Sequence, residues 1–202
     1  KVNIVSNIRS ADMNSEEFID WMPYFPNLGR VKISGHTSGN LDDLDCTGMD
    51  VEMGDATSFS GDVHLTNTTE GKSMYIDAGI NFLVTNVRDY NQFIAPMTGY
   101  VLPSEINRFG TVSLSGKYTG GINELKILGL IETGIGEADL NLDLNDLSNS
   151  ELMSYAGYIE ARDIDLGVFL KDENFGKSSF KGNILGHGLT KESVDFEADL
   201  EA

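Results

Sequence analysis

The sequence predicts an all-β protein in which repeated antiparallel meanders form an elongated, twisted or curled sheet, with three short helices at crossovers. Three observations predict this class: strict alternation of apolar and polar residues, internal repeats, and a composition of 22 glycines but only 4 prolines in 202 residues. Abundant glycine with little proline suits many strands joined by tight turns better than it suits helices.

Alternation is clearest in three runs. In 138–145 and 194–201 every second residue is apolar, and the residues between are Asp, Glu or Asn. Successive strand side chains point to opposite faces, so each run predicts a strand with one apolar face and one wet face, as in antiparallel sheets. A third run, 74–85, places on one predicted face Met74, Ile76, Ala78, Ile80, Phe82 and Val84.

The glycine-flanked segment 29–41 recurs at 110–122 and, more weakly, at 176–186. In each copy two glycines stand four residues apart. A strand rather than a helix follows them, so we expect positive φ or sheet curvature at these positions and not a phosphate-binding loop. They are Gly35, Gly39, Gly116, Gly120, Gly182 and Gly186.

What surrounds each copy also repeats. A strand-like run comes before it, at 2–8, 74–87 and 155–161, and then a short helical patch, at Ser15–Met22, Asp89–Ile94 and Leu166–Leu170. Further alternating strands follow, near 44–53, 58–66, 123–133, 136–145 and 192–201. The approximate repeat units are 1–70, 71–150 and 151–202, the last incomplete. Their unequal length favours meanders that add to one continuous sheet over a β-helix with fixed rungs.

The net charge of −18 and a pI near 4.3 argue against nucleic acid as a partner and against steady adsorption to an anionic bilayer. No run approaches the roughly 20 apolar residues that span a bilayer. Because the chain begins with Lys1 and shows no signal-peptide pattern, we expect it to be a fragment of a larger repeat protein.

Catalytic and metal sites are not expected. Cys46 is the single cysteine and is interpreted as a small buried hydrophobe. Aspartates at 42–45 and 139–146 lack the spacing of a calcium loop and are interpreted as solvated charge. The histidines are scattered, and no Gly-x-Ser-x-Gly motif occurs. We therefore expect a protein that is not an enzyme and has no cofactor.

The predicted helices are too few to cover the apolar faces of so many strands. The sheet then either closes into a sandwich or leaves an apolar trough that holds acyl chains or unfolded hydrophobic segments. A carbohydrate-active β-helix enzyme is a third, weaker alternative. The residues predicted to line the trough are Met74, Ile76, Ile80, Phe82, Val112, Leu114, Ile127, Leu140, Leu142, Leu144, Phe180, Val194 and Phe196.

The run Phe93–Pro96 leading into Phe109–Gly120, with its continuation Leu130–Leu144, resembles the repeat of TamB-like proteins, especially those of Bacteroidota. The segments Phe18–Pro23 and Leu166–Leu170 resemble the same element. The similarity covers nearly the whole chain as a pattern of glycine and apolar positions. It contains no catalytic signature.

The TamB-like family and its AsmA relatives are large envelope proteins with an N-terminal membrane anchor and a long β-groove across the periplasm. They are implicated in outer-membrane protein insertion and phospholipid transfer. The resemblance implies that this chain is a periplasmic section of such a groove, shielding lipid acyl chains or nascent outer-membrane polypeptide. It also implies an anchor, and an outer-membrane assembly partner, outside this fragment. The alternative is a closed-core surface β-sandwich, an adhesin or structural repeat that binds glycan or protein.

Overall fold

The computed structural model describes residues 3–14, 29–40, 42–68, 73–95, 104–149, 151–188, 193 and 195–201. Eleven strands form one open antiparallel sheet in which the strand order follows the chain order. The strands are β1 (Asn3–Asn14), β2 (Arg30–Asn40), β3 (Asp43–Met53), β4 (Thr57–Thr66), β5 (Tyr75–Thr85), β6 (Val112–Gly121), β7 (Glu124–Thr133), β8 (Gly136–Asn145), β9 (Ser154–Asp165), β10 (Lys177–His187) and β11 (Asp195–Glu201). The all-β, antiparallel prediction is confirmed, whereas the described strands form an open, uncurled sheet and do not confirm the predicted curl into a groove.

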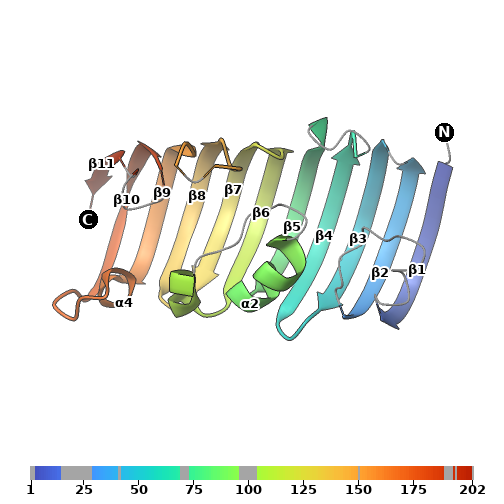
Figure 1. Cartoon of the computed structure of the whole chain (residues 1–202), viewed down its shortest axis with the longest axis horizontal. Coiled ribbons are helices and arrows are strands. Elements are labelled where there is room, and N and C mark those ends of the chain that lie inside the picture. Colours follow the sequence, from blue (N-terminus) through green and yellow to red (C-terminus); the bar gives the residue numbers. More distant parts are fainter. Residues whose placement is uncertain are drawn as a thin grey trace.

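Figure 1 shows the strands side by side from N to C terminus, with β1 and β11 at the two ends of the sheet. Extensive packing between strands is confined to neighbours in sequence. This is the meander that alternating strands with short turns produce, and the later strands begin and end close to the predicted limits.

Short helices occupy the longer connections. Val87–Asp89 (α2) and the π-helical turn Tyr90–Ile94 (η2) follow β5, and Leu166–Leu170 (α4) follows β9. These positions match two of the predicted patches, whereas Ser15–Met22 lies outside the described residues. A 3-10 helix at Ser104–Phe109 (η3) was not predicted. In Figure 1, α2 and α4 lie along the same edge of the sheet.

A buried hydrogen-bond cluster fixes α2 against the sheet. Asp89, only 2% exposed, accepts hydrogen bonds from the backbone N–H of Ala56 (2.8 Å) and the hydroxyl of Thr57 (3.0 Å). Thr57 is also 2.9 Å from the hydroxyl of Thr85. Asn86 caps the helix by accepting from the Asp89 N–H at 2.8 Å. A buried carboxylate with these partners ties the crossover to β4 and β5.

One extra residue interrupts the pairing of the first strand of each predicted unit. The shifts lie between Ile8 and Ala11 in β1, between Ile80 and Leu83 in β5, and opposite Ser178–Phe180 in β9. These are β-bulges, which increase local twist and change which face the following residues occupy. A fourth lies in β3 between Cys46 and Met49.

The recurring glycines adopt conformations that L side chains rarely adopt. In the first two copies φ is +144° and +122° at Gly35 and Gly39, and +124° and +157° at Gly116 and Gly120. Gly182 has φ +157°, whereas Gly186 is not among the positive-φ residues. A Cβ at Gly116 would collide with the carbonyl oxygen of Leu128 on the neighbouring strand. Close strand approach therefore requires glycine here.

Replacing Gly116 by alanine should lower the free energy of unfolding by about 2 kcal/mol or more, because the new Cβ meets both strain and backbone collision. Gly79 is the matched control: it lies on neighbouring β5, outside the positive-φ region, with no atom within 4 Å of an added Cβ. Gly79→Ala should leave stability unchanged or raise it by up to about 1 kcal/mol. Urea unfolding followed by circular dichroism measures both; equal losses would contradict the assignment.

Candidate functional site

Cross-strand pairing assembles one continuous apolar face on the sheet, here called the apolar face. Paired residues on neighbouring antiparallel strands share a face, so the register traces rows from strand to strand. One such row is apolar at each position from β1 to β10. It runs through Ala11, Ile33, Val51, Phe59, Leu83, Leu114, Ile131, Ala138, Ala161 and Phe180.

Most of the residues predicted to line a trough lie together on the apolar face. Met74 precedes β5, and Val194 lies outside the described residues. Phe196 pairs with Gly186 on β10. Those that the pairing places on it are Ile76, Ile80, Val112, Leu114, Ile127, Leu140, Leu142, Leu144 and Phe180.

Phe82 lies on the opposite face. Its partner on β4 is Ser60, whereas the apolar-face pair is Phe59 with Leu83. The bulge between Ile80 and Leu83 inserts one residue, so the alternation of 74–85 changes phase within the strand. The sequence interpretation assumed an unbroken period of two. It was therefore wrong for the end of this run, where Leu83 and not Phe82 joins the apolar face.

The sequence interpretation also omitted apolar-face residues on β1 to β4, β6, β7, β9 and β10. Alternation was the available signal in β2 and β4, where residues such as Val31, Ile33, Val63 and Leu65 occupy every second position. Those missed include Ile4, Ile8, Ile33, Val51, Phe59, Val63, Leu65, Tyr118, Leu125, Ile131, Ile159 and Ile184.

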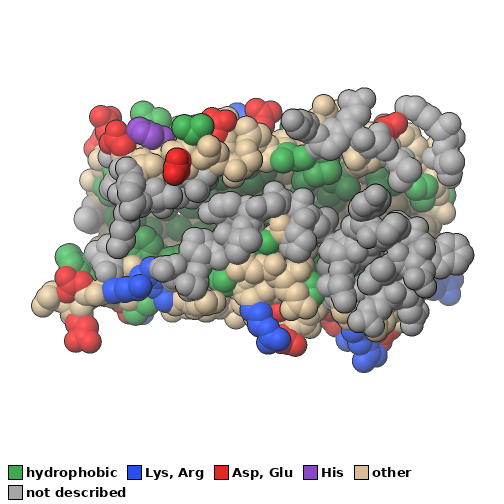
Figure 2. Space-filling model, viewed as in Figure 1, with side chains coloured by type: hydrophobic (Ala, Val, Ile, Leu, Met, Phe, Trp, Pro, Cys, Tyr) green, Lys and Arg blue, Asp and Glu red, His purple; other side chains and the backbone are tan. Residues whose placement is uncertain are grey.

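The large side chains of the apolar face are mostly half-buried. On β7 and β8 this holds for Leu125, Ile127, Leu140, Leu142 and Leu144. The described strands all belong to one sheet, so no second sheet of described strands packs over this face. Figure 2, viewed from the side on which α2 lies, shows hydrophobic side chains along the middle of this face, set back between polar margins. Among the described residues this is a one-sided apolar surface of the kind that packs against a further apolar layer.

The other face of the sheet, here called the polar face, is charged and linked by ion pairs between neighbouring strands. Arg162 on β9 contacts Glu137 (2.7 Å) and Asp139 (2.6 Å) on β8. The hydrogen bonds that Arg162 donates to these two carboxylates raise its pKa. Lys32 with Glu52 (2.7 Å) joins β2 to β3 in the same way. The polar face is therefore built to remain in water.

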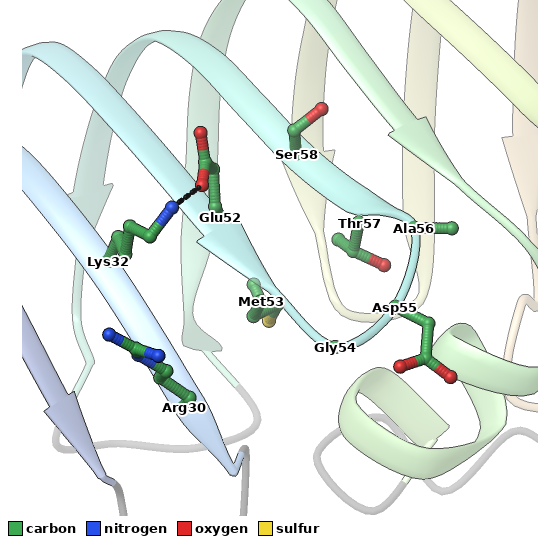
Figure 3. A pocket seen from close by; sticks show the side chains of 9 residues that line it. All are labelled: Arg30, Lys32, Glu52, Met53, Gly54, Asp55, Ala56, Thr57 and Ser58. Carbon is green, nitrogen blue, oxygen red and sulfur yellow. Dashed lines mark hydrogen bonds and ion pairs between the residues drawn. The ribbon is translucent and has the colours of Figure 1, made fainter.

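A hollow of about 500 Å³ lies at the turn between β3 and β4 (Figure 3). Its charged residues are already paired: Arg30 with Asp12, Lys32 with Glu52, and Asp55 with Arg88 at 2.7 Å. The hydroxyl of Thr57, another residue of its wall, belongs to the buried cluster with Asp89. We assign no chemistry to this hollow.

The aspartates near residue 45 meet a histidine on the polar face. His64 lies 2.6 Å from Asp45 through Nδ1 and 3.5 Å from Asp43 through Nε2. Sequence reasoning treated these side chains separately because β3 and β4 bring them together only through pairing. Within the described ranges no group of His, Cys, Asp and Glu has the arrangement of a metal site.

Among the described helices, none is both long and apolar enough to cross a membrane. In comparisons with known proteins, no family model, no curated protein and no solved structure matches this chain.

The ion pair between Arg30 and Asp12 predicts a pH dependence of stability. Arg30 donates to both carboxylate oxygens, at 2.7 and 2.6 Å, and these hydrogen bonds hold the pKa of Asp12 below its usual 3.8. Because the folded-state pKa is depressed, the contribution of the pair is complete above pH 3.8 and is lost as the pH falls through the lower folded value.

Arg30→Gln should therefore lower the melting temperature at neutral pH, and the difference from the wild type should shrink once the pH is taken below 3.8. Arg9→Gln on β1 makes the same charge change at an exposed position with no ion pair in the described part of the chain. Thermal melts across the acid range measure both variants. A gap for Arg30→Gln that persists at the lowest pH would contradict the pair's role.

Proposed function

We propose that this chain is a non-enzymatic segment of a larger, TamB-like or AsmA-like β-groove protein of the bacterial periplasm. In this proposal the apolar face shields phospholipid acyl chains, or hydrophobic stretches of unfolded outer-membrane polypeptide, during envelope assembly. The observation that supports it is the continuity of the apolar face from strand to strand, with half-buried side chains and one layer of described strands.

The dimensions of the face suit acyl chains. Ten steps between the eleven strands, at about 4.8 Å each, give a face about 50 Å long. An acyl chain spans about 15 Å, half of a bilayer's hydrocarbon core of about 30 Å. A row of apolar side chains across the sheet is therefore long enough for more than one chain end to end.

The division of charge supports a role in an aqueous compartment. Ion pairs and excess carboxylates on the polar face keep the sheet solvated, while the apolar face remains for cargo. In this proposal the membrane anchor and any outer-membrane assembly partner belong to parts of the protein outside this segment.

The alternative is a closed-core adhesin or structural repeat that binds glycan or protein. It needs a second apolar layer over the face, and the described strands form a single sheet. Under this alternative the protein takes up no lipid.

Adjacent residues on β7 provide a direct test. Ile127 is half-buried on the apolar face between Tyr118 and Leu142, whereas Leu128 points to the polar face and is 62% exposed. A photoreactive side chain at position 127 should crosslink to phospholipid acyl chains, and the same group at 128 should not. Mass spectrometry of the crosslinked protein, purified from cells in mild detergent, measures the yield at each position.

A substitution pair completes the test. Ile127→Asn should reduce the phospholipid that native mass spectrometry finds on the protein severalfold, because a buried amide without partners penalises apolar binding. Leu128→Asn should leave the bound lipid unchanged. Lipid-free wild-type protein, or equal crosslinking at positions 127 and 128, would refute the proposal.

A further inference from the structure

Tyr118 carries a polar group within the apolar face. It lies in the middle of β6, paired with Ala78 on β5 and with Ile127 on β7. The side chain is 8% exposed, and its hydroxyl is buried with no hydrogen-bond partner among the described residues. Phenylalanine would fill the same place without a buried unpaired hydroxyl, so this oxygen requires a partner that the described residues do not supply.

Two features bear on contact between this hydroxyl and a ligand. The apolar-face neighbours of Tyr118 along its own strand are Gly116 and Gly120, which place no side chain next to the ring along β6. Contact with cargo requires the ring to turn along β6, over these glycines, so that its covered hydroxyl becomes exposed. Burial raises the pKa of Tyr118, which keeps the hydroxyl protonated and able to donate at neutral pH.

We propose that the Tyr118 hydroxyl donates a hydrogen bond to an ester carbonyl oxygen of a zwitterionic diacyl phospholipid bound on the apolar face. This inference rests on the proposed function and names its cargo. It makes β6 the place where the junction between headgroup and acyl chains is held, with the chains extending over the aliphatic side chains of β7 and β8, such as Ile127 and Leu142.

Hydrogen-bond complementarity favours an ester lipid over a polypeptide. A peptide segment brings one N–H donor per residue, and each needs an acceptor when it is buried. The backbones of β5, β6 and β7 are already paired with one another. The ester groups of a phospholipid have hydrogen-bond acceptors and no donors. A single tyrosine hydroxyl can therefore donate to one of them without any buried donor of the lipid esters being left unpaired.

Charge complementarity selects the headgroup. The net charge of −18 repels anionic headgroups and is indifferent to a zwitterionic one. Phosphatidylethanolamine is therefore the probe, and an anionic phosphatidylglycerol with the same chains should bind more weakly at low salt. Equal or tighter binding of the anionic lipid would overturn the headgroup assignment.

The test compares diester phosphatidylethanolamine with its diether analogue, which has the same chains and headgroup but no carbonyl oxygen. Wild-type protein should prefer the diester by about 5- to 10-fold, the value of one hydrogen bond. Tyr118→Phe should bind both lipids alike, at the affinity that the wild type shows for the diether. Tyr158→Phe, on the polar face and 37% exposed, should retain the wild-type preference.

Native mass spectrometry titrations measure the affinities, and the infrared carbonyl band of isotope-labelled diester gives an independent readout. That band should shift to lower frequency on the wild type and not on Tyr118→Phe. Equal binding of diester and diether by wild-type protein, as when water satisfies the hydroxyl, would overturn the role of Tyr118 and leave the proposed function standing. Failure of both lipids to bind the wild type would instead overturn the proposed function.

Discussion

Keeping the side-chain alternation of eleven strands in phase is the constraint on which the structure depends. A one-residue slip in pairing moves a strand's apolar set from one face to the other. β-Bulges keep the strands in phase where the spacing of the apolar residues changes. In β5 even-numbered residues up to Ile80 lie on the apolar face, and the extra residue places odd-numbered residues there from Leu83 onward. As a result, Phe59, Leu83 and Leu114 lie in one row although β5 is out of phase with a simple period of two.

Glycine is the local requirement that makes this arrangement possible. At Gly116 and Gly182 the backbone has positive φ, and an added Cβ would strike a carbonyl of the neighbouring strand. Both glycines lie on the strand after a bulged strand, β6 after β5 and β10 after β9. Bulge and glycine therefore recur together: the extra residue twists the strand on one side, and the missing side chain admits close approach of the strand on the other side, β7 or β11. The repeated glycine motif in the sequence records this local geometry.

Sequence reasoning predicted the all-β antiparallel class, the later strands and part of the apolar face, because alternation in runs such as 138–145 reports directly on strands and faces. It failed at Phe82, because nothing in the residue types around Asn81 marks an inserted position. It also gave no role to Asp89 or Tyr118. The partners of Asp89, Ala56 and Thr57, come from more than 30 residues earlier in the chain, and the unpaired state of the Tyr118 hydroxyl exists only once burial is known.

The same architecture explains how further strands can extend the apolar face without changes to the strands already present. Strands pack extensively only with their neighbours in sequence, so a further meander adds its own pairing and leaves the existing pairs unchanged. A closed sandwich lacks this property, because each added strand must be matched across two layers. In a single sheet, ion pairs such as Arg162 with Glu137 keep the polar face compatible with solvent. Each added strand lengthens the apolar face by one inter-strand spacing. The length of the apolar face then depends on the number of repeats alone.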